Sequence, residues 1–186
     1  MHFYKGDTLT ILKKLHSKFK IKNIGYNLDY SPFALKRDIS IRKWAIKNNI
    51  GCFSEEDSLL NNIMKEDVKI YKVFTPYFKY MKKNFKINKP VTKKVKILKF
   101  TKKIKEELKV SRLKEFYEAN DNLNVQPGRD NALKQLALVR KQKKYDKMRD
   151  FLIYKTTHLS AYINLGLLSI REVYYYCVKK LGINND

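Results

Sequence analysis

Apolar residues in the first third of the chain alternate between the spacing of strands and the spacing of helices. Three short apolar runs are typical of strands, at residues 1–4, 21–27 and 50–53. Two amphipathic stretches between these runs have helical spacing, at residues 8–19 and 32–50. The order strand, helix, strand, helix, strand predicts an α/β segment, a partial doubly wound parallel sheet of three strands flanked by helices.

Residues that favour helix ends lie at the borders of both predicted helices. Asp7 precedes the first helix and can cap it. Ser31 occupies the N-cap position of the second helix, and Pro32 follows at the first helical position, where its missing N–H costs nothing. Gly51 offers the left-handed conformation that ends a helix.

Positive charge dominates the middle of the chain. Residues 79–109 contain 13 Lys and two Glu, a net charge of +11. A short helix is expected to start at Thr75 and Pro76, but little periodicity follows it, so this segment is interpreted as a basic linker over the surface. The alternative is a patch that follows a phosphate backbone.

The last sixty residues have helical spacing. One apolar stripe is expected to comprise Ala132, Leu133, Leu136 and Val139. A short helix follows and ends at Gly166. In the final helix, Ser169 and Glu172 have the spacing of a capping box and Gly182 provides the stop. The change from α/β to all-α patterning predicts two domains, divided near residue 120.

The composition narrows the class of protein. A chain of 186 residues with 44% hydrophobic content can bury a core in one or two small domains. The 41 Lys and Arg against 18 Asp and Glu give a net charge of +23, which attracts polyanions, most often nucleic acid. The alternative is that Lys serves as the default surface residue.

Several classes of site find no support in the sequence. Cys52 and Cys177 are far apart and belong to no metal-binding pattern, so they are interpreted as small apolar fillers in a reducing compartment, and no metal site is expected. No signal region opens the chain, and no stretch is long enough to cross a bilayer. These patterns predict a soluble intracellular protein, cytoplasmic or nuclear, with no membrane partner.

Hydroxyl groups gather in front of the short helix near the end of the chain. Thr156, Thr157 and Ser160 lie within the stretch "RDFLIYKTTHLSAYINLG". Taken alone, Ser160 could serve only as an N-cap, and the two threonines could belong to an ordinary loop.

Four motifs occur in a fixed order along the chain: "NLDYSPFALKRDISI", "YKVFTPYFKYM", "GRDNALKQL" and "YDKMRDFLIYKTTHLSAYINLGLLSIREVYY". Together they resemble the photolyase/cryptochrome family, of the class I deoxyribodipyrimidine photolyase type. The resemblance implies an α/β antenna domain, a wrapping linker and an all-helical domain that holds FAD. It divides the chain into a partial antenna domain over residues 1–84, a basic linker over 85–124 and the N-terminal part of the helical FAD-binding domain over 125–186.

The resemblance also implies roles for individual residues. It assigns FAD binding to Tyr145, Thr156, Thr157, His158, Leu159 and Ser160. The hydroxyls and the backbone N–H groups of this run would hold the FAD diphosphate, which needs donors that replace its water. Tyr145 would pack against the cofactor. Arg149 matches a position that contacts a DNA phosphate, a role suited to the guanidinium fork.

Other parts of the family pattern are missing or altered. By resemblance, the chain begins inside the α/β domain and ends soon after the first FAD-binding motif, so the residues that surround the flavin ring and touch the lesion are not expected here. No catalytic residue is therefore assigned. Phe33 and Ala34 stand where some members have the Asn-Glu pair that holds a folate antenna, so a folate site is not supported and the antenna chromophore is unknown. Arg37 and Asp38 are interpreted as a structural ion pair.

Two functional hypotheses follow. The first is a photolyase-like fragment related to light-driven, FAD-dependent repair of cyclobutane pyrimidine dimers, inactive alone or completed by other polypeptides that supply the missing segments, with ultraviolet-damaged DNA as its partner. The second is a non-enzymatic basic DNA-binding protein derived from that family. A scaffold without a DNA role is disfavoured by the charge of +23.

Overall fold

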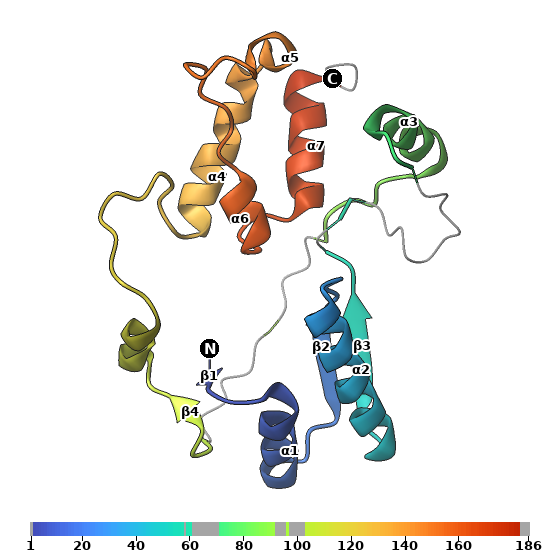
Figure 1. Cartoon of the computed structure of the whole chain (residues 1–186), viewed down its shortest axis with the longest axis vertical. Helices are drawn as coiled ribbons and strands as arrows, with labels where there is room; N and C mark the ends of the chain where they lie inside the picture. The colour runs from blue at the N-terminus through green and yellow to red at the C-terminus, as the bar shows by residue number, and fades with distance from the viewer. Residues whose placement is uncertain (1, 58, 61–70, 92–95, 97–102, 183–186) are drawn as a thin grey trace. The chain divides into compact units, whose positions relative to one another are not determined.

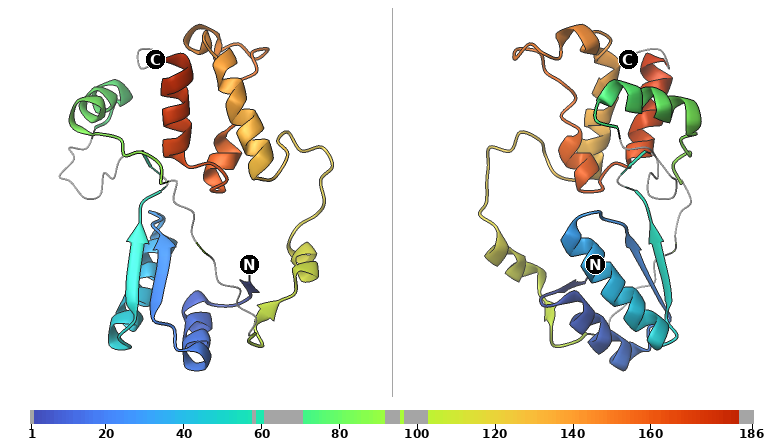
Figure 2. Two further views of the ribbon diagram at one scale, coloured as in Figure 1. Left: turned by 180° about the vertical axis from the view of Figure 1, so that it is seen from behind. Right: turned by 45° about the vertical axis from the view of Figure 1, so that its right-hand side comes forward.

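The computed structural model describes residues 2–57, 59–60, 71–91, 96 and 103–182. Its contacts divide the chain into two compact units (Figures 1 and 2). We call residues 1–56 with 94–122 the α/β unit, and residues 57–93 with 123–186 the helical unit. This arrangement confirms the predicted fold class, an α/β segment followed by helices. The division at residues 84 and 124 stays a prediction.

The α/β unit is built around two parallel strands. Its elements are β1 (Phe3–Tyr4), α1 (Thr8–Phe19), β2 (Asn23–Asn27), α2 (Pro32–Lys47), β3 (Gly51–Glu55), β4 (Glu107–Leu108) and the 3₁₀ helix η2 (Val110–Phe116). Strands β2 and β3 pair in parallel, with Ile24 opposite Cys52. Helix α2 packs against β3 and lies alongside this pair in Figure 2. Its buried residues Ala34, Ile41 and Ala45 provide most of the core of the unit.

The prediction that the first strand joins this parallel sheet is wrong. Strand β1 pairs with β4 in an antiparallel ladder, Phe3 opposite Leu108. The Nδ1 atom of His2 lies 2.9 Å from a carboxylate oxygen of Glu107 and adds a polar contact to this pair. A short apolar run shows that a strand forms but does not specify its partner, and this partner lies about one hundred residues further along the chain.

Side-chain caps form at the start of both predicted helices. A carboxylate oxygen of Asp7 accepts the N–H of Thr10 at 2.8 Å, and the hydroxyl of Ser31 accepts the N–H of Ala34 at 3.3 Å. The prediction that Gly51 ends α2 is wrong. The helix ends at Lys47, Asn49 takes the left-handed conformation with φ of 55°, and Gly51 begins β3.

Gly51 lies close to the paired strand. A Cβ atom at this position would meet the side-chain oxygen of Asn23, so a substitution here would require the exposed Asn23 side chain to move. Within α2, the Nε of Arg37 lies 2.7 Å from a carboxylate oxygen of Asp38, whose side chain is buried, so the predicted ion pair is confirmed. Phe33 is exposed and Ala34 is buried, and neither side chain carries a polar group.

The helical unit contains six helical segments among its described residues. They are α3 (Phe74–Asn84), α4 (Arg129–Ala137), the 3₁₀ helix η3 (Leu138–Lys141), α5 (Tyr145–Met148), α6 (Ser160–Asn164) and α7 (Ile170–Leu181). Its core joins α4, η3, α6 and α7 through Ala132, Leu136, Val139, Leu159, Tyr162, Leu168 and Val173. Leu133, which was predicted in the same stripe, is 40% exposed. Ala132, Leu136 and Val139 follow the i, i+4, i+7 spacing of one helix face, and Leu133 is turned away from it by about 100°.

An ion pair joins α4 to α7. Both guanidinium Nη atoms of Arg129 contact the carboxylate of Glu172, at 2.8 and 2.6 Å. The predicted capping box therefore forms only in part: the hydroxyl of Ser169 accepts the N–H of Arg171 at 3.3 Å, while Glu172 binds Arg129. The pair therefore links the first residue of α4 to the first turn of α7.

Among the described residues, no helix is long and apolar enough to span a membrane.

Candidate functional site

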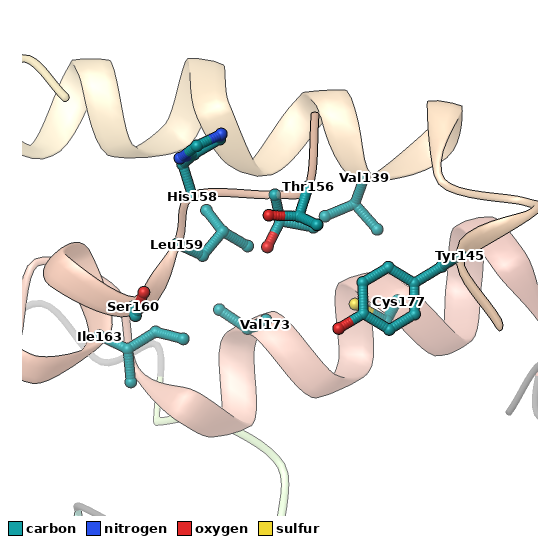
Figure 3. A pocket seen from close by; sticks show the side chains of 10 residues that line it. Val139, Tyr145, Thr156, His158, Leu159, Ser160, Ile163, Val173 and Cys177 are labelled. Atoms are coloured by element: carbon teal, nitrogen blue, oxygen red, sulfur yellow. The ribbon is translucent and has the colours of Figure 1, made fainter. Parts of the chain in front are cut away.

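A cavity of about 400 Å³ lies within the helical unit (Figure 3). Its walls come from η3, α5, the loop before α6, α6 and α7. They are formed by Val139, Tyr145, Thr156, Thr157, His158, Leu159, Ser160, Ile163, Val173 and Cys177. All six residues that the sequence analysis assigned to FAD binding therefore lie around one cavity.

Two glutamine side chains fix the loop that carries the hydroxyl groups. The side-chain amide of Gln142 donates to the backbone carbonyl of Lys155 at 3.0 Å, and that of Gln135 donates to the carbonyl of Thr157 at 2.9 Å. Leu159 anchors the end of the loop because its side chain is buried in the core. The course of this loop is thus set by α4 and by the residue after η3.

The backbone of this loop leaves donors for a ligand. His158 takes a left-handed conformation with φ of 49°, which is uncommon for a residue with a side chain. Within the part of the chain that the structure describes, no acceptor binds the backbone N–H groups of residues 157–161. Helix α6 begins at Ser160, and its N-cap is Leu159, which makes no side-chain cap bond. Ser160 therefore does not serve as the N-cap.

Tyr145 contributes an aromatic ring to the cavity. It is the first residue of α5, and its N–H donates to the carbonyl of Gln142 at 3.0 Å. In Figure 3 its ring extends toward the middle of the lining side chains, whereas the His158 ring lies at their periphery. The ring can therefore pack against a planar group, while His158 contributes chiefly its backbone.

The remaining walls are apolar and carry no charge. Val139, Ile163, Val173 and Cys177 line them, and none of these was predicted as a site residue. Burial raises the pKa of the Cys177 thiol, so it stays protonated near neutral pH. The sequence signal for this wall was the helical spacing of Val173 and Cys177, four residues apart in the last helix.

Arg149 does not line the cavity. It caps the end of α5, its side chain is 58% exposed, and its Nε lies 3.8 Å from a carboxylate oxygen of Asp150. An exposed pair at this distance holds the guanidinium weakly, so Arg149 can exchange Asp150 for a phosphate. The stretch of sequence before it also carries the exposed cations Arg140, Lys141, Lys143, Lys144 and Lys147, together with the exposed Asp146.

The cavity suits the diphosphate of a dinucleotide. Three aliphatic hydroxyls, one phenol and unbound N–H groups provide donors, and no carboxylate lies in the lining to repel an anion. The apolar walls give ring systems a surface to pack on, and the volume lies within the range of about 300–1,000 Å³ typical of small-ligand sites. Among the described residues, no group of three or more His, Cys, Asp or Glu could hold a metal ion.

Comparisons with solved structures place this fold among photolyases and cryptochromes. A bacterial class III photolyase from Agrobacterium tumefaciens matches 97% of the chain with a TM-score of 0.80 and 22% identity. A photolyase from Sulfolobus tokodaii, solved with two FAD molecules, matches 88% with a TM-score of 0.65 and 26% identity. A cryptochrome from Synechocystis matches 97% with a TM-score of 0.68 and 16% identity.

These matches cover only part of each solved structure. The chain spans 40%, 36% and 40% of the three solved chains, in the order given above. No curated protein matches the sequence. The family model for DNA photolyase matches residues 1–96. The assignment to class I within this family stays a prediction. The chain belongs to the DNA photolyase family.

Proposed function

We propose that this chain provides the phosphate-binding part of a flavin site in a photolyase-like protein, related to light-driven repair of cyclobutane pyrimidine dimers in DNA. The chain would be inactive alone or would act as one part of a split enzyme. One observation carries the proposal: Tyr145 and the run Thr156–Ser160 line a single cavity whose donors suit a diphosphate. The FAD molecules in the Sulfolobus tokodaii photolyase support the choice of cofactor.

Each lining residue has a specific task under this proposal. The hydroxyls of Thr156, Thr157 and Ser160 donate to phosphate oxygens, together with the N–H groups of His158 and Leu159. The Tyr145 ring packs against the cofactor, and the apolar wall excludes water from it. Gln135 and Gln142 bind no ligand themselves but position the loop through their bonds to its carbonyls.

Arg149 would bind the DNA partner. Its guanidinium is exposed and follows a stretch of sequence rich in exposed lysines, so a phosphate of ultraviolet-damaged DNA can replace Asp150. When bound, FAD supplies the light-driven electron transfer that repair requires. In this chain, the part played by its own residues is to hold the diphosphate and to attract the DNA backbone.

The affinity of the chain alone for FAD is expected to be low. Phosphate contacts at one end of a cofactor contribute a few kcal/mol at most, and the two ring systems also need enclosing walls. The chain spans 40% or less of the length of the solved structures it matches. We therefore propose that further polypeptide, in the same chain or in a partner, completes the site.

Nuclear magnetic resonance can test this weak binding residue by residue. FAD at millimolar concentration is expected to shift the amide signals of Thr156, Thr157 and His158. The double substitution Thr156→Val with Thr157→Val keeps the shape of both side chains, removes both hydroxyls and should reduce these shifts. Thr8→Val, at an exposed threonine of the α/β unit, is the matched control and should leave them unchanged.

The same titration separates the outcomes. Signal changes confined to residues outside the cavity, or equal changes in the double valine variant, would contradict the proposed site. A second assay measures light-dependent repair of ultraviolet-damaged oligonucleotide by this chain, with and without a polypeptide that contains the remaining family helices. DNA binding without repair in either mixture would favour the alternative, a non-enzymatic basic DNA-binding protein.

A further inference from the structure

Helix α3 carries an exposed aromatic pair that takes no part in the flavin cavity. The rings of Phe74 and Phe78 stack with centroids 5.8 Å apart and an interplanar angle of 21°. Phe74 is 72% exposed and Phe78 is 43% exposed. Large apolar rings in such exposed positions are costly in water, so a stacked and exposed pair indicates a binding surface.

Lysine residues accompany this aromatic pair along the sequence. The ammonium group of Lys82 lies over the Phe78 ring, 5.7 Å from its centroid. Phe74, Phe78 and Lys82 are spaced four residues apart and therefore form one stripe along the helix; we call these three residues the α3 platform. Residues 72–89 contain six Lys and no Asp or Glu, and all six are exposed.

The two phenylalanines lie at the edge of the packing of α3, where Phe74 also contacts the Tyr77 ring at 6.4 Å. Met81 is buried, and Tyr71 makes ring contacts with both Tyr77 and Tyr80, at 6.1 and 5.7 Å. The segment after the helix is tied to α7 because the Tyr175 hydroxyl donates to the carbonyl of Ile87 at 2.6 Å. The helix is thus held chiefly by its tyrosines and Met81, and the exposed surface of the Phe74 and Phe78 rings is left for a ligand.

We propose that the α3 platform binds single-stranded nucleic acid without sequence preference, with an unpaired base stacked on Phe74 and phosphates held by the neighbouring lysines. Aromatic rings beside a basic track are the usual means of binding single strands, because every base has a π face. A duplex hides those faces within its own stack. A protein surface of mixed charge is less suited to the platform, because residues 72–89 carry six lysines and no acidic residue and would repel the cations of such a surface.

This inference goes beyond the proposed flavin function and does not depend on it, because none of the platform residues lines the cavity. The test uses the full chain and a fluorescein-labelled oligothymidine, with binding followed by fluorescence anisotropy. The double substitution Phe74→Ala with Phe78→Ala should weaken binding about fivefold or more, from the stacking free energy of about 1–3 kcal/mol per base. Phe33→Ala removes another exposed ring, 77% exposed on α2, and should leave binding unchanged.

An abasic oligonucleotide of equal length separates stacking from charge. It keeps the phosphates and lacks the bases, so it should bind more weakly to the wild type and should not respond to the double alanine substitution. Lys82→Gln should reduce the slope of log affinity against log salt by about 0.7, the value for one phosphate contact on a single strand. If the alanine variant loses helix, Phe78→Leu replaces it: this substitution keeps an apolar side chain, removes the ring and should also weaken binding.

Two results would overturn the inference. One is a folded double alanine variant that binds oligothymidine as tightly as the wild type. The other is a wild type that binds abasic and thymidine oligonucleotides equally well, since charge alone would then account for binding. A change of oligomeric state in the phenylalanine variants, without a change in oligonucleotide affinity, would assign the platform to protein contacts and would also overturn it.

Discussion

Truncation of Leu136 tests which face of α4 forms the core. Leu136 is 2% exposed and belongs to the core cluster, whereas Leu133, three residues earlier on the same helix, is 40% exposed. The apolar stripe in the sequence places both in the core. The substitutions Leu136→Ala and Leu133→Ala make the same chemical change in the same helix, so their difference isolates burial.

The structure sets the size of each effect. Leu136→Ala removes a buried side chain and leaves a cavity, which costs about 2–5 kcal/mol of the free energy of unfolding. Leu133→Ala loses only the partly buried portion of its side chain and gains slightly in helix propensity, so about 1 kcal/mol or less is expected. The two variants should therefore differ by at least about 1–2 kcal/mol.

Urea unfolding followed by circular dichroism of the helices measures this difference. The only tryptophan, Trp44, lies on α2 in the α/β unit, so its fluorescence shows separately whether that unit remains folded. Equal losses of stability in the two variants would refute the assignment of the α4 faces. A loss below about 1 kcal/mol for Leu136→Ala would refute the burial of that side chain, because it is less than the usual cost of a core truncation.

Two further predictions concern the loop and a helix cap. Gln135→Ala removes the donor to the Thr157 carbonyl and should cost about 1 kcal/mol in urea unfolding and reduce the FAD-induced shifts of the loop amides, while Lys134→Ala at the exposed neighbour should do neither. The N–H and hydroxyl of Thr10 hold the pKa of Asp7 below its ordinary value of 3.8, so the cap stabilises α1 fully above that value and loses its effect as pH falls through the lowered pKa. Asp7→Asn keeps an acceptor without a titrating group, so the acid-induced loss of helical circular dichroism should become smaller; an unchanged acid transition would contradict this linkage.

The chemistry of the candidate site could be read from the sequence, but its walls could not. The run Thr156–Ser160 and Tyr145 were assigned through the family motif, and in the structure they line one cavity. Val173 and Cys177 complete the lining from the last helix, where their spacing indicated only an apolar face. A residue in such a face contacts either a core or a ligand, and the choice depends on which elements pack opposite it.

The two glutamines illustrate a second limit. Gln135 lies between Lys134 and Leu136, Gln142 lies between two lysines, and nothing in their local pattern marks them. Their amides bind carbonyls 22 and 13 residues further along the chain. Hydrogen bonds between distant segments form only when the helices have brought those segments together, so their partners are a property of the fold.

The sequence by itself determined the local structure of this protein. The caps at Asp7 and Ser31, the helical character of α1, α2, α4 and α7 and the strand character of β2 and β3 follow from side-chain chemistry within a few residues. Only the tertiary structure decided that β1 pairs with β4, that Glu172 binds Arg129 and that the Asn23 side chain lies against Gly51. The physical reason is range: caps and periodicity act within a turn or a strand, whereas strand partners, ion pairs between helices and cavity walls depend on contacts between segments far apart in the chain.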